Sequence, residues 1–206
     1  MPPLYKKITT PIRLRLEKMG LMKVRKDFLT IFPKNTIGAE LGVFQGKLSK
    51  DILEVARPKE LHLMDPWWKV IGEYYGDWSR YHNDGELLST KKAYRQAVDN
   101  VKSADNHHVA VFHIDDDLIT LAKFPDNYFD WVYLDSSHQY EQTVKELSLL
   151  EKKVKPDGII AGHDWYPDPK AVHHGVYKAV HEFCNRHNWE VFKLDKKFTQ
   201  WAIRKK

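Results

Sequence analysis

The chain has 206 residues, 42% of them hydrophobic, and its 33 basic and 28 acidic residues give a formal net charge of +5. This length and composition predict one globular domain with a sizeable core and exclude a disordered chain. No run of about 18 apolar residues occurs, and the start lacks the apolar stretch of a secretory signal, so we expect a cytoplasmic protein. The single cysteine, Cys184, excludes an internal disulfide and is expected to be an ordinary packed thiol.

Basic residues are concentrated at the two ends of the chain. The N-terminal stretch has acidic partners only at Glu17 and Asp27, and the chain ends in Arg204-Lys205-Lys206. We interpret residues 1–34 as a basic, helical extension and residues 35–206 as the main domain. A solvated helix face is the simpler explanation of the charge, and contact with an anionic membrane, contact with nucleic acid or dimerisation are the alternatives.

Strand-like and helix-like segments alternate along the main domain, which predicts a parallel sheet covered by helices. The helical segments have apolar residues every three or four positions, as at Leu48, Ile52 and Val55. In chain order, we expect strands at 36–41, 60–64, 109–114, 128–134 and 159–161, helices at 47–56, 87–102, 140–154 and 172–186, a turn at 155–158, and a closing hairpin of 189–194 and 198–203.

The segment 66–90 differs from its surroundings, because it is rich in aromatic residues and glycines. A long irregular segment inside a compact domain is usually functional or disordered, and the aromatic residues favour a lid or a substrate loop. Tryptophans could form walls of an acceptor site here and after the fifth strand, and packing alone explains them equally well. These tryptophans are Trp67, Trp68, Trp78 and Trp165.

Polar residues follow the ends of all five predicted parallel strands. Ligands of open α/β sheets bind at the carboxyl ends of the strands, so we expect the functional site there. This repeated placement is more informative than any single motif.

The turn after the first strand reads Glu40-Leu41-Gly42-Val43-Phe44-Gln45-Gly46. Gly42 and Gly46 permit a tight turn and a close approach of the backbone to a ligand. Phe44 stands where a dinucleotide-binding turn has its middle glycine, which argues against NAD or FAD and favours a nucleoside ligand without phosphate. Asp65, at the end of the second strand, could accept hydrogen bonds from both ribose hydroxyls. A role in capping backbone amides is the alternative for Glu40 and Asp65.

Four stretches of the chain together resemble the class I methyltransferases often called methyltransferase 24, which are related to macrocin and catechol O-methyltransferases. The stretches are AELGVFQGKLSKDIL, ELHLMDPW, FDWVYLDSSHQYEQTVKEL and KPDGIIAGHDW. The resemblance covers about residues 36–192. It implies a Rossmann-like α/β fold, with a seven-stranded, mostly parallel sheet, helices on both faces and an antiparallel last strand. It also implies S-adenosylmethionine as the cofactor.

The same resemblance implies roles for individual residues. Glu40 is expected near the methionine part of the cofactor, Asp65 at the ribose, and Asp115 and Asp116 at the adenine. Many relatives have Gly-Asp-Ser where this chain has Ile114-Asp115-Asp116, and a helix cap is the alternative for these aspartates. The complete set expected to bind the cofactor is Glu40, Gly42, Phe44, Gly46, Asp65, Asp115, Asp116 and Asp135.

Methylation of a hydroxyl requires alignment of donor and acceptor and removal of the acceptor's proton. Asp135 and Asp164 end neighbouring strands, and together with His163 they could hold Mg²⁺ or Mn²⁺, which would lower the pKa of the acceptor. Relatives carry acidic or amide ligands where this chain has His163. His138 is expected to be catalytic, either as the base or as a neighbour of the metal, and His163 is the second candidate for the base. His173 and His174, after the fifth strand, either border the acceptor site or lie on the surface.

The expected function is therefore O-methylation of a sugar or small-molecule hydroxyl. A nucleic-acid methyltransferase is less expected, because the run Asp135-Ser136-Ser137-His138 is not the Asn/Asp-Pro-Pro-aromatic run of amino-methylating enzymes. A non-catalytic module of the same fold is the other alternative. An NAD-dependent oxidoreductase and a mononuclear iron oxygenase fit the motifs less well. The oligomeric state has no signature in the sequence.

Overall fold

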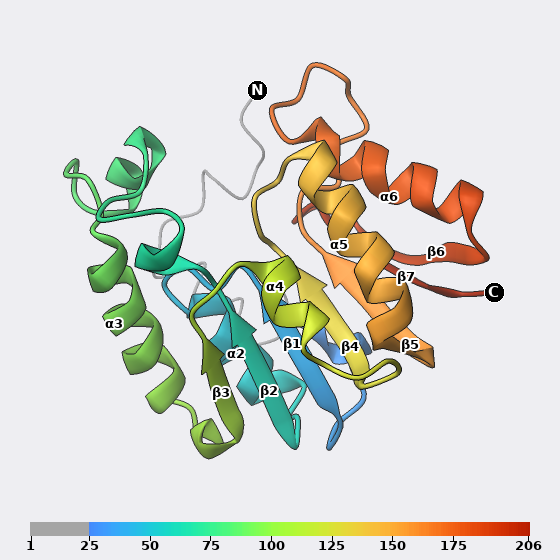
Figure 1. Cartoon of the computed structure of the whole chain (residues 1–206), viewed down its shortest axis with the longest axis horizontal. Coiled ribbons are helices and arrows are strands. Elements are labelled where there is room, and N and C mark those ends of the chain that lie inside the picture. Colours follow the sequence, from blue (N-terminus) through green and yellow to red (C-terminus); the bar gives the residue numbers. More distant parts are fainter. Residues whose placement is uncertain (1–24) are drawn as a thin grey trace, which may run out of the picture.

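The computed structural model of the chain describes residues 25–206, which form one seven-stranded sheet in the order β3-β2-β1-β4-β5-β7-β6 (Figure 1). Its strands are β1 (Ile37–Leu41), β2 (Glu60–Met64), β3 (Ala110–His113), β4 (Phe129–Leu134), β5 (Val154–Gly162), β6 (Trp189–Asp195) and β7 (Gln200–Lys205). The pairs among β1 to β5 are parallel, and β7 runs antiparallel to both β5 and β6. The predicted sheet with an antiparallel last strand is confirmed.

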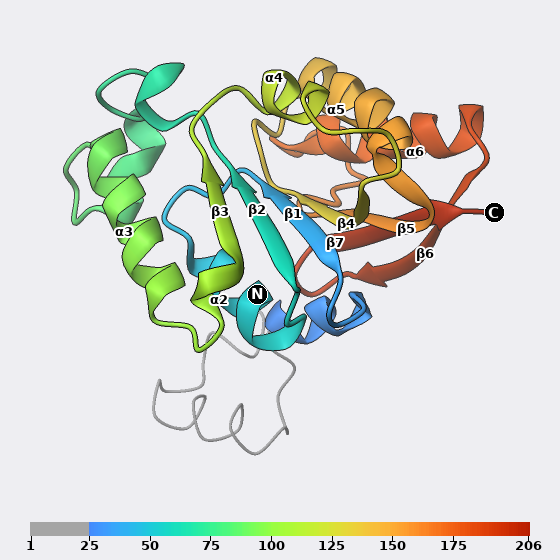
Figure 2. The same cartoon turned by 60° about the horizontal axis from the view of Figure 1, so that its bottom comes forward.

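Helices cover both faces of the sheet, as Figure 2 shows. One face carries η2 (Arg25–Ile31), α2 (Lys47–Val55) and α3 (Thr90–Lys102), and the other carries α4 (Asp117–Ala122), α5 (Tyr140–Lys153) and α6 (His174–Arg186). Short 3-10 helices are η3 (Trp67–Lys69), η4 (Asp77–His82) and η5 (His107–Val109). Side chains alternate along β4, so that Trp131 packs in one apolar layer and Val132 in the other.

Two predicted segments differ from the observed elements. The expected turn at 155–158 lies inside β5, where Phe129 pairs with Val154 but Trp131 already pairs with Ile159. The extra residues of β5 form a bulge, and Pro156 has no backbone N–H for the ladder, so the local composition resembled a turn. The span of α4 was not predicted, although a helix cap at Asp115–Asp117 was considered, because six residues are too few to show a helical period.

The N-terminal prediction is only partly covered by the described residues. Residues 1–24, which carry most of the basic extension, lie outside them. Within η2, Phe28 and Leu29 are buried in the apolar layer that contains α2. No helix within residues 25–206 is long and apolar enough to cross a membrane. Cys184 is buried in α6, and burial raises the pKa of its thiol to about 11, as expected for a packed thiol.

A chain of three polar side chains connects β2 to β3 away from the predicted site. His62 Nδ1 lies 2.9 Å from His113 Nε2, and His62 Nε2 lies 3.0 Å from Glu60 Oε1. Burial is the main cause that lowers the pKa of both histidines below 6.5. The neutral imidazoles are therefore part of the folded state.

We expect these histidines to make the protein less stable in mild acid. Because their pKa values are lowered in the folded protein, their contribution is fully present above about pH 6.5 and is lost as the pH falls through the lowered values. Chemical denaturation at pH 7.5 and 5.5 measures the effect. The pH-dependent loss should be smaller in His62→Gln and unchanged in His108→Ala, which alters an exposed histidine. An equal loss in all three proteins would contradict this account.

Candidate active site

The carboxyl ends of β2, β1, β4 and β5 form one continuous edge of the sheet, because these strands are neighbours in that order. Backbone bonds continue the ladder past the strand ends: Asp135 N donates to Leu41 O (2.8 Å) and His163 N donates to Leu134 O (3.2 Å). The loops that follow these strands therefore begin side by side, which brings the predicted residues of four motifs to the same edge.

Both glycines of the predicted cofactor turn are required by close packing within the protein. Gly42 has a φ of 85°, and a Cβ there would lie 2.1 Å from the backbone oxygen of Asp135. Gly46 has a φ of 71°, and its Cβ would lie 2.7 Å from the Cα of Ala97 in α3. The turn is thus pressed between the end of β4 and α3. A side chain at either position would displace the backbone that borders the site.

Asp65 joins the cofactor turn to the aromatic segment 66–90. Its Oδ2 accepts from the Phe44 amide (2.8 Å), and its Oδ1 accepts from the Trp67 amide (2.9 Å). The carboxyl is only 5% exposed. Burial raises its pKa above the ordinary value, and the bonds from backbone amides partly offset that shift. The negative charge is thus held between two loops rather than in open solvent.

The surroundings of Asp65 fit the nucleoside part of S-adenosylmethionine. Tyr75 packs edge-on against Phe44, with ring centroids 5.1 Å apart, and its buried hydroxyl has no hydrogen-bond partner among the described residues. Burial raises the pKa of Tyr75, and the charge of Asp65 raises it further. Each carboxylate oxygen can accept a second hydrogen bond. A ribose with two adjacent hydroxyls would use the spare capacity of Asp65 and provide a partner for Tyr75.

The aspartates after β3 have local partners. Asp116 caps α4, since its side chain accepts from the Leu118 and Ile119 amides, as the alternative interpretation expected. Asp115 Oδ2 lies 2.6 Å from Lys69 Nζ and 3.4 Å from Lys123 Nζ. An adenine bound here would meet an aspartate that is already engaged by two lysines.

Glu40, Asp117 and Glu146 are among the buried acids of the fold, and sequence reasoning identified only Glu40 of these three as a site residue. Glu40, which was predicted, accepts a hydrogen bond from Ser49 in α2. Glu146 in α5 accepts from Ser136 (2.8 Å), and burial raises its pKa to about 7. Burial, with the nearby charge of Glu146, raises the pKa of Asp117 well above its ordinary value. The signal that could have identified Glu146 is its position on the buried face of the predicted helix at 140–154.

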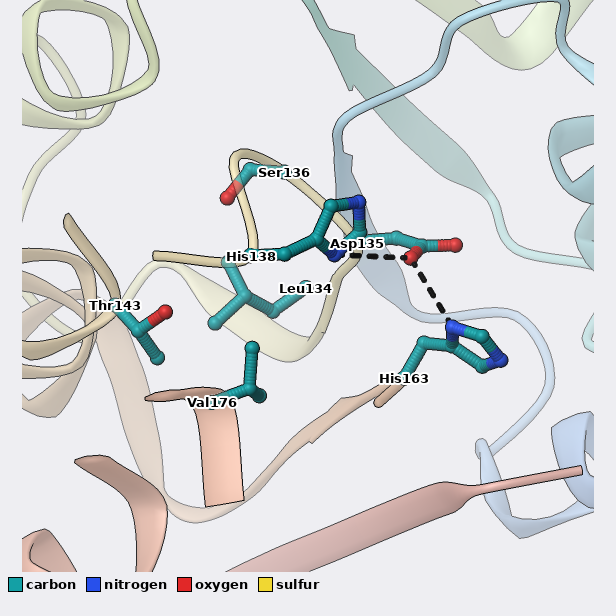
Figure 3. Close-up of a pocket in the computed structure, with 7 residues that line it drawn as sticks. All are labelled: Leu134, Asp135, Ser136, His138, Thr143, His163 and Val176. Atoms are coloured by element: carbon teal, nitrogen blue, oxygen red, sulfur yellow. Dashed lines mark ion pairs between the residues drawn. The ribbon is translucent and has the colours of Figure 1, made fainter. Parts of the chain in front are cut away.

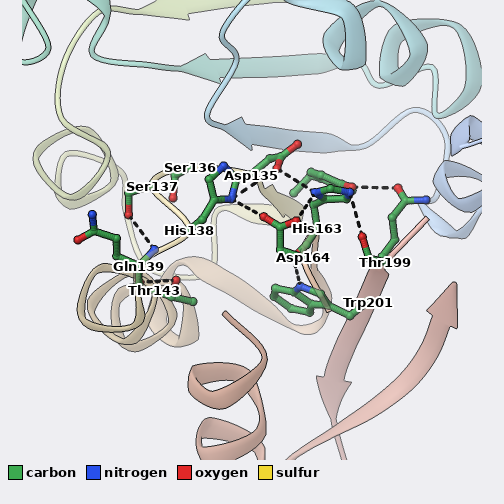
Figure 4. A network of polar contacts seen from close by, with 12 residues as sticks. Asp135, Ser136, Ser137, His138, Gln139, Thr143, His163, Asp164, Thr199 and Trp201 are labelled. Atoms are coloured by element: carbon green, nitrogen blue, oxygen red, sulfur yellow. Dashed lines mark hydrogen bonds and ion pairs between the residues drawn. The ribbon is translucent and has the colours of Figure 1, made fainter. Parts of the chain in front are cut away.

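His138 and Asp164 form a close charged pair between the loops after β4 and β5. His138 Nδ1 lies 2.7 Å from Asp164 Oδ2 and 4.0 Å from Asp135 Oδ1 (Figure 4). Both His138 and Asp164 have left-handed backbones, with φ values of 60° and 65°. This conformation is strained for residues other than glycine, and such strain persists where the surroundings hold it in place. The two loops therefore aim these side chains at each other.

Electrostatics stabilise this pair in its charged form. Burial lowers the pKa of His138, but the hydrogen bond to Asp164 and the charge of Asp135 outweigh it, so the pKa lies above 6.5. Burial raises the pKa of Asp164, but bonds from His138 and His163 outweigh that effect and hold it well below the ordinary value. Asp164 is therefore ionised at neutral pH and can act as an acceptor for two imidazoles.

His163 occupies the other side of Asp164. Its Nδ1 lies 2.9 Å from Asp164 Oδ1 and 3.6 Å from Asp135 Oδ1, and its Nε2 lies 3.1 Å from the Thr199 hydroxyl. One ligand atom from each of Asp135, His163 and Asp164 lies within 4.8 Å of the others. Metal-bound histidines usually donate their second ring nitrogen to an outer partner, and Thr199 provides one. These three residues, predicted from the sequence, fit a divalent cation.

A small pocket lies beside these side chains (Figure 3). It has room for about one water molecule, about 10 Å³. Its lining residues are Leu134, Asp135, Ser136, His138, Thr143, His163 and Val176. The pocket is far smaller than the ~300–1,000 Å³ of small-molecule sites, so we expect the surrounding loops to move when a ligand binds.

A larger cavity of about 680 Å³ lies at the amino ends of the strands, next to residues such as Asn35, Lys59 and Val109. None of the predicted site residues lines it. Ligands of open α/β sheets bind at the opposite, carboxyl edge, so the candidate site is the one that contains Asp65, Asp135 and Asp164.

The four tryptophans proposed as walls of an acceptor site have different surroundings. Trp67 is fully buried, and its Nε1 donates to Phe44 O (3.0 Å). Trp165 packs edge-on against Tyr177. Trp78 is 57% exposed and lies against Phe44, with ring centroids 5.2 Å apart. Trp78 therefore has both a free surface and a position next to the predicted cofactor turn.

Comparisons with known proteins agree with this architecture. A family model described as a methyltransferase domain matches residues 39–165, which is more than half of the chain. None of the curated proteins matches the chain.

Solved structures with the same fold include three of low sequence identity. A protein from Corynebacterium glutamicum has 13% identity and a TM-score of 0.63, over 97% of this chain and 93% of that chain. A protein described as an rRNA methylase from Clostridium thermocellum has 13% identity and a TM-score of 0.60, over 89% and 98%. A protein described as a type 11 methyltransferase from Sulfolobus solfataricus has 18% identity and a TM-score of 0.52, over 84% and 85%. At these identities the likeness concerns the fold alone.

Proposed function

Because the chain belongs to the methyltransferase domain family, whose members are class I, S-adenosylmethionine-dependent methyltransferases, we propose that it methylates a hydroxyl of a sugar or another small molecule with help from a divalent cation. The observation that carries the proposal is the 2.7 Å contact between His138 and Asp164, beside Asp135 and His163. A base that is oriented by a carboxylate is what a hydroxyl acceptor requires.

The residues at the cofactor end of the site hold and orient S-adenosylmethionine. When bound, S-adenosylmethionine supplies a methyl group that its sulfonium has already activated. Asp65 accepts hydrogen bonds from the ribose hydroxyls while it also accepts hydrogen bonds from the Phe44 and Trp67 amides. Asp65 also attaches the start of segment 66–90 to the cofactor turn through the Trp67 amide.

The acceptor end removes a proton. An ionised carboxylate only accepts hydrogen bonds, so the proton of His138 lies on Nδ1, toward Asp164, and Nε2 is left to accept the proton of the hydroxyl. When the cofactor supplies its methyl group to the acceptor oxygen, His138 Nε2 would take up this proton, and S-adenosylhomocysteine would be the other product. Asp135, His163 and Asp164 would hold the cation, which would lower the pKa of the acceptor hydroxyl.

The proposal is tested by methyl transfer to matched acceptors. Purified protein, S-adenosylmethionine and Mg²⁺ are incubated with sugars, catechols and their amino analogues, and products are detected by mass spectrometry. We expect products from hydroxyl acceptors only and at least about a tenfold loss of rate with a chelator. Methylation of the amino analogues alone, or of RNA alone, would refute O-methylation of a small molecule. Tight cofactor binding without transfer to any acceptor would favour a non-catalytic module.

A further inference from the structure

His138 has a second neighbour that the proposed mechanism does not use. His173, in the loop before α6, lies beside it, with ring centroids 4.8 Å apart and an interplanar angle of 51°. One ligand atom from each of His138, Asp164 and His173 lies within 4.8 Å of the others. His138 comes from the loop after β4, whereas Asp164 and His173 come from the two ends of the loop between β5 and α6.

We propose that His138, Asp164 and His173 form a second cation site, which takes a divalent transition metal such as Zn²⁺ and, when filled, prevents His138 from accepting the proton of the substrate. Cation binding at this cluster is independent of the proposed function. Its inhibitory consequence rests on the role of His138 in that function.

The distances within the cluster are those of ligands around one ion. Two atoms bound at about 2.1 Å lie about 3.0 Å apart at a right angle and about 4.2 Å apart on opposite sides. The contact between His138 Nδ1 and Asp164 Oδ2 is 2.7 Å, and the remaining separations are within 4.8 Å. Binding one ion would require the side chains to move together by more than half an ångström wherever a separation approaches 4.8 Å.

The two oxygens of Asp164 separate this cluster from the first one. Oδ1 faces His163 at 2.9 Å, whereas Oδ2 faces His138 at 2.7 Å. A carboxylate with one oxygen on each side can serve two adjacent cation sites. Besides Asp164, the first cluster contains Asp135 and His163, and the second contains His138 and His173.

The ligand types predict different ions for the two clusters. Magnesium prefers oxygen ligands, and two carboxylates with one imidazole still provide them. Two imidazoles and one carboxylate suit zinc, cobalt or iron(II), because nitrogen ligands favour transition metals. The second cluster therefore discriminates against magnesium.

The surroundings of the second cluster are ordered and accessible. His174, next to His173, connects the two ends of the segment between β5 and α6, because its Nδ1 lies 2.9 Å from the backbone oxygen of Tyr166. The His138 side chain is 32% exposed and His173 is partly exposed, whereas the Asp164 side chain is 5% exposed. An ion can thus enter from solvent and meet a buried negative charge.

Cobalt titration tests the site without any acceptor. The absorption of bound Co²⁺ in the visible range reports the number of ions held by metal-free protein, and Zn²⁺ is then used to displace them. We expect His173→Ala and His138→Gln each to bind one equivalent fewer than the wild type. His108→Ala, which removes an exposed histidine at the other end of the sheet, should bind as the wild type does. Circular dichroism melting curves establish that the variants are folded.

Equal binding of Co²⁺ by wild type, His173→Ala and His138→Gln would overturn the proposal. In methyl-transfer assays with Mg²⁺, we also expect Zn²⁺ to inhibit the wild type at a concentration at least tenfold lower than it inhibits His173→Ala. Loss of one equivalent in the variants without zinc inhibition of the wild type would support the site but refute the role of His138 as the base. The two proposals can therefore fail separately.

Discussion

Replacing Asp65 by alanine is expected to weaken the binding of S-adenosylmethionine by at least about 100-fold. The side chain would lose its hydrogen bonds to two ribose hydroxyls, and bonds to a charged group contribute about 1.5–3 kcal/mol each. A loss of about 3 kcal/mol corresponds to about 100-fold in the dissociation constant. The same change releases the Phe44 and Trp67 amides, which loosens the turn. Calorimetric titration with S-adenosylmethionine and S-adenosylhomocysteine measures the affinity.

Two further variants make the Asp65 experiment specific. Asp77→Ala alters an exposed aspartate in the same segment and should bind the cofactor as the wild type does. Asp65→Asn keeps one acceptor oxygen and nearly the same volume but turns an NH2 group toward one of the two backbone amides, so it should be somewhat less stable and bind with intermediate affinity. If Asp65→Ala bound the cofactor as tightly as the wild type, the ribose would lie elsewhere and the proposed orientation of the cofactor would be wrong.

Replacing His138 by alanine is expected to lower the rate of methyl transfer by about 10²–10⁴-fold, which is the usual contribution of a positioned base. The affinity for S-adenosylmethionine should not change, because His138 contacts Asp164 rather than the cofactor turn. The rate of the wild type should rise with pH through a pKa above 6.5, since the pKa of His138 is raised and only the neutral imidazole accepts a proton. Single-turnover measurements across pH report both effects.

Asp164→Asn tests the orientation of that base. An amide keeps the shape of the side chain but removes the charge that raises the pKa of His138, so the pH profile should shift toward lower pH. The exposed His108→Ala serves as the control for loss of a histidine. A rate for His138→Ala within about threefold of the wild type would transfer the role of the base to His163, which shares the Asp164 carboxylate.

The segment 66–90 packs against the cofactor turn and is therefore expected to respond to cofactor binding. Its aromatic residues Tyr75 and Trp78 pack against Phe44 of the cofactor turn, and Asp65 bonds the start of the segment. Because the segment packs against Phe44 and is bonded to Asp65, we expect it to move when the cofactor binds beside these two residues. Ligand binding should thus change the tryptophan fluorescence of Trp78, which is half-exposed.

The sequence by itself determined the sheet and its functional edge. Strands and helices differ in the period of their apolar residues, which is a local property, so the positions of β1, β2 and β4 could be predicted closely. Because parallel strands place their carboxyl ends together, the same pattern predicted that Asp65, Asp135 and Asp164 share one edge. Short or irregular elements were predicted less well, as α4 and the bulge in β5 illustrate.

Only the tertiary structure decided which partner each of these residues has. The sequence did not indicate whether Asp164 contacts His138 or His163, and in the fold it contacts both. The left-handed backbones of His138 and Asp164 help to orient these side chains, and no pattern of residue types reveals such a backbone. Tyr75 and His173 likewise reach the site through loops whose path depends on packing against distant elements. Periodicity follows from neighbouring residues, whereas side-chain pairs across loops follow from contacts that form only when the whole sheet is assembled.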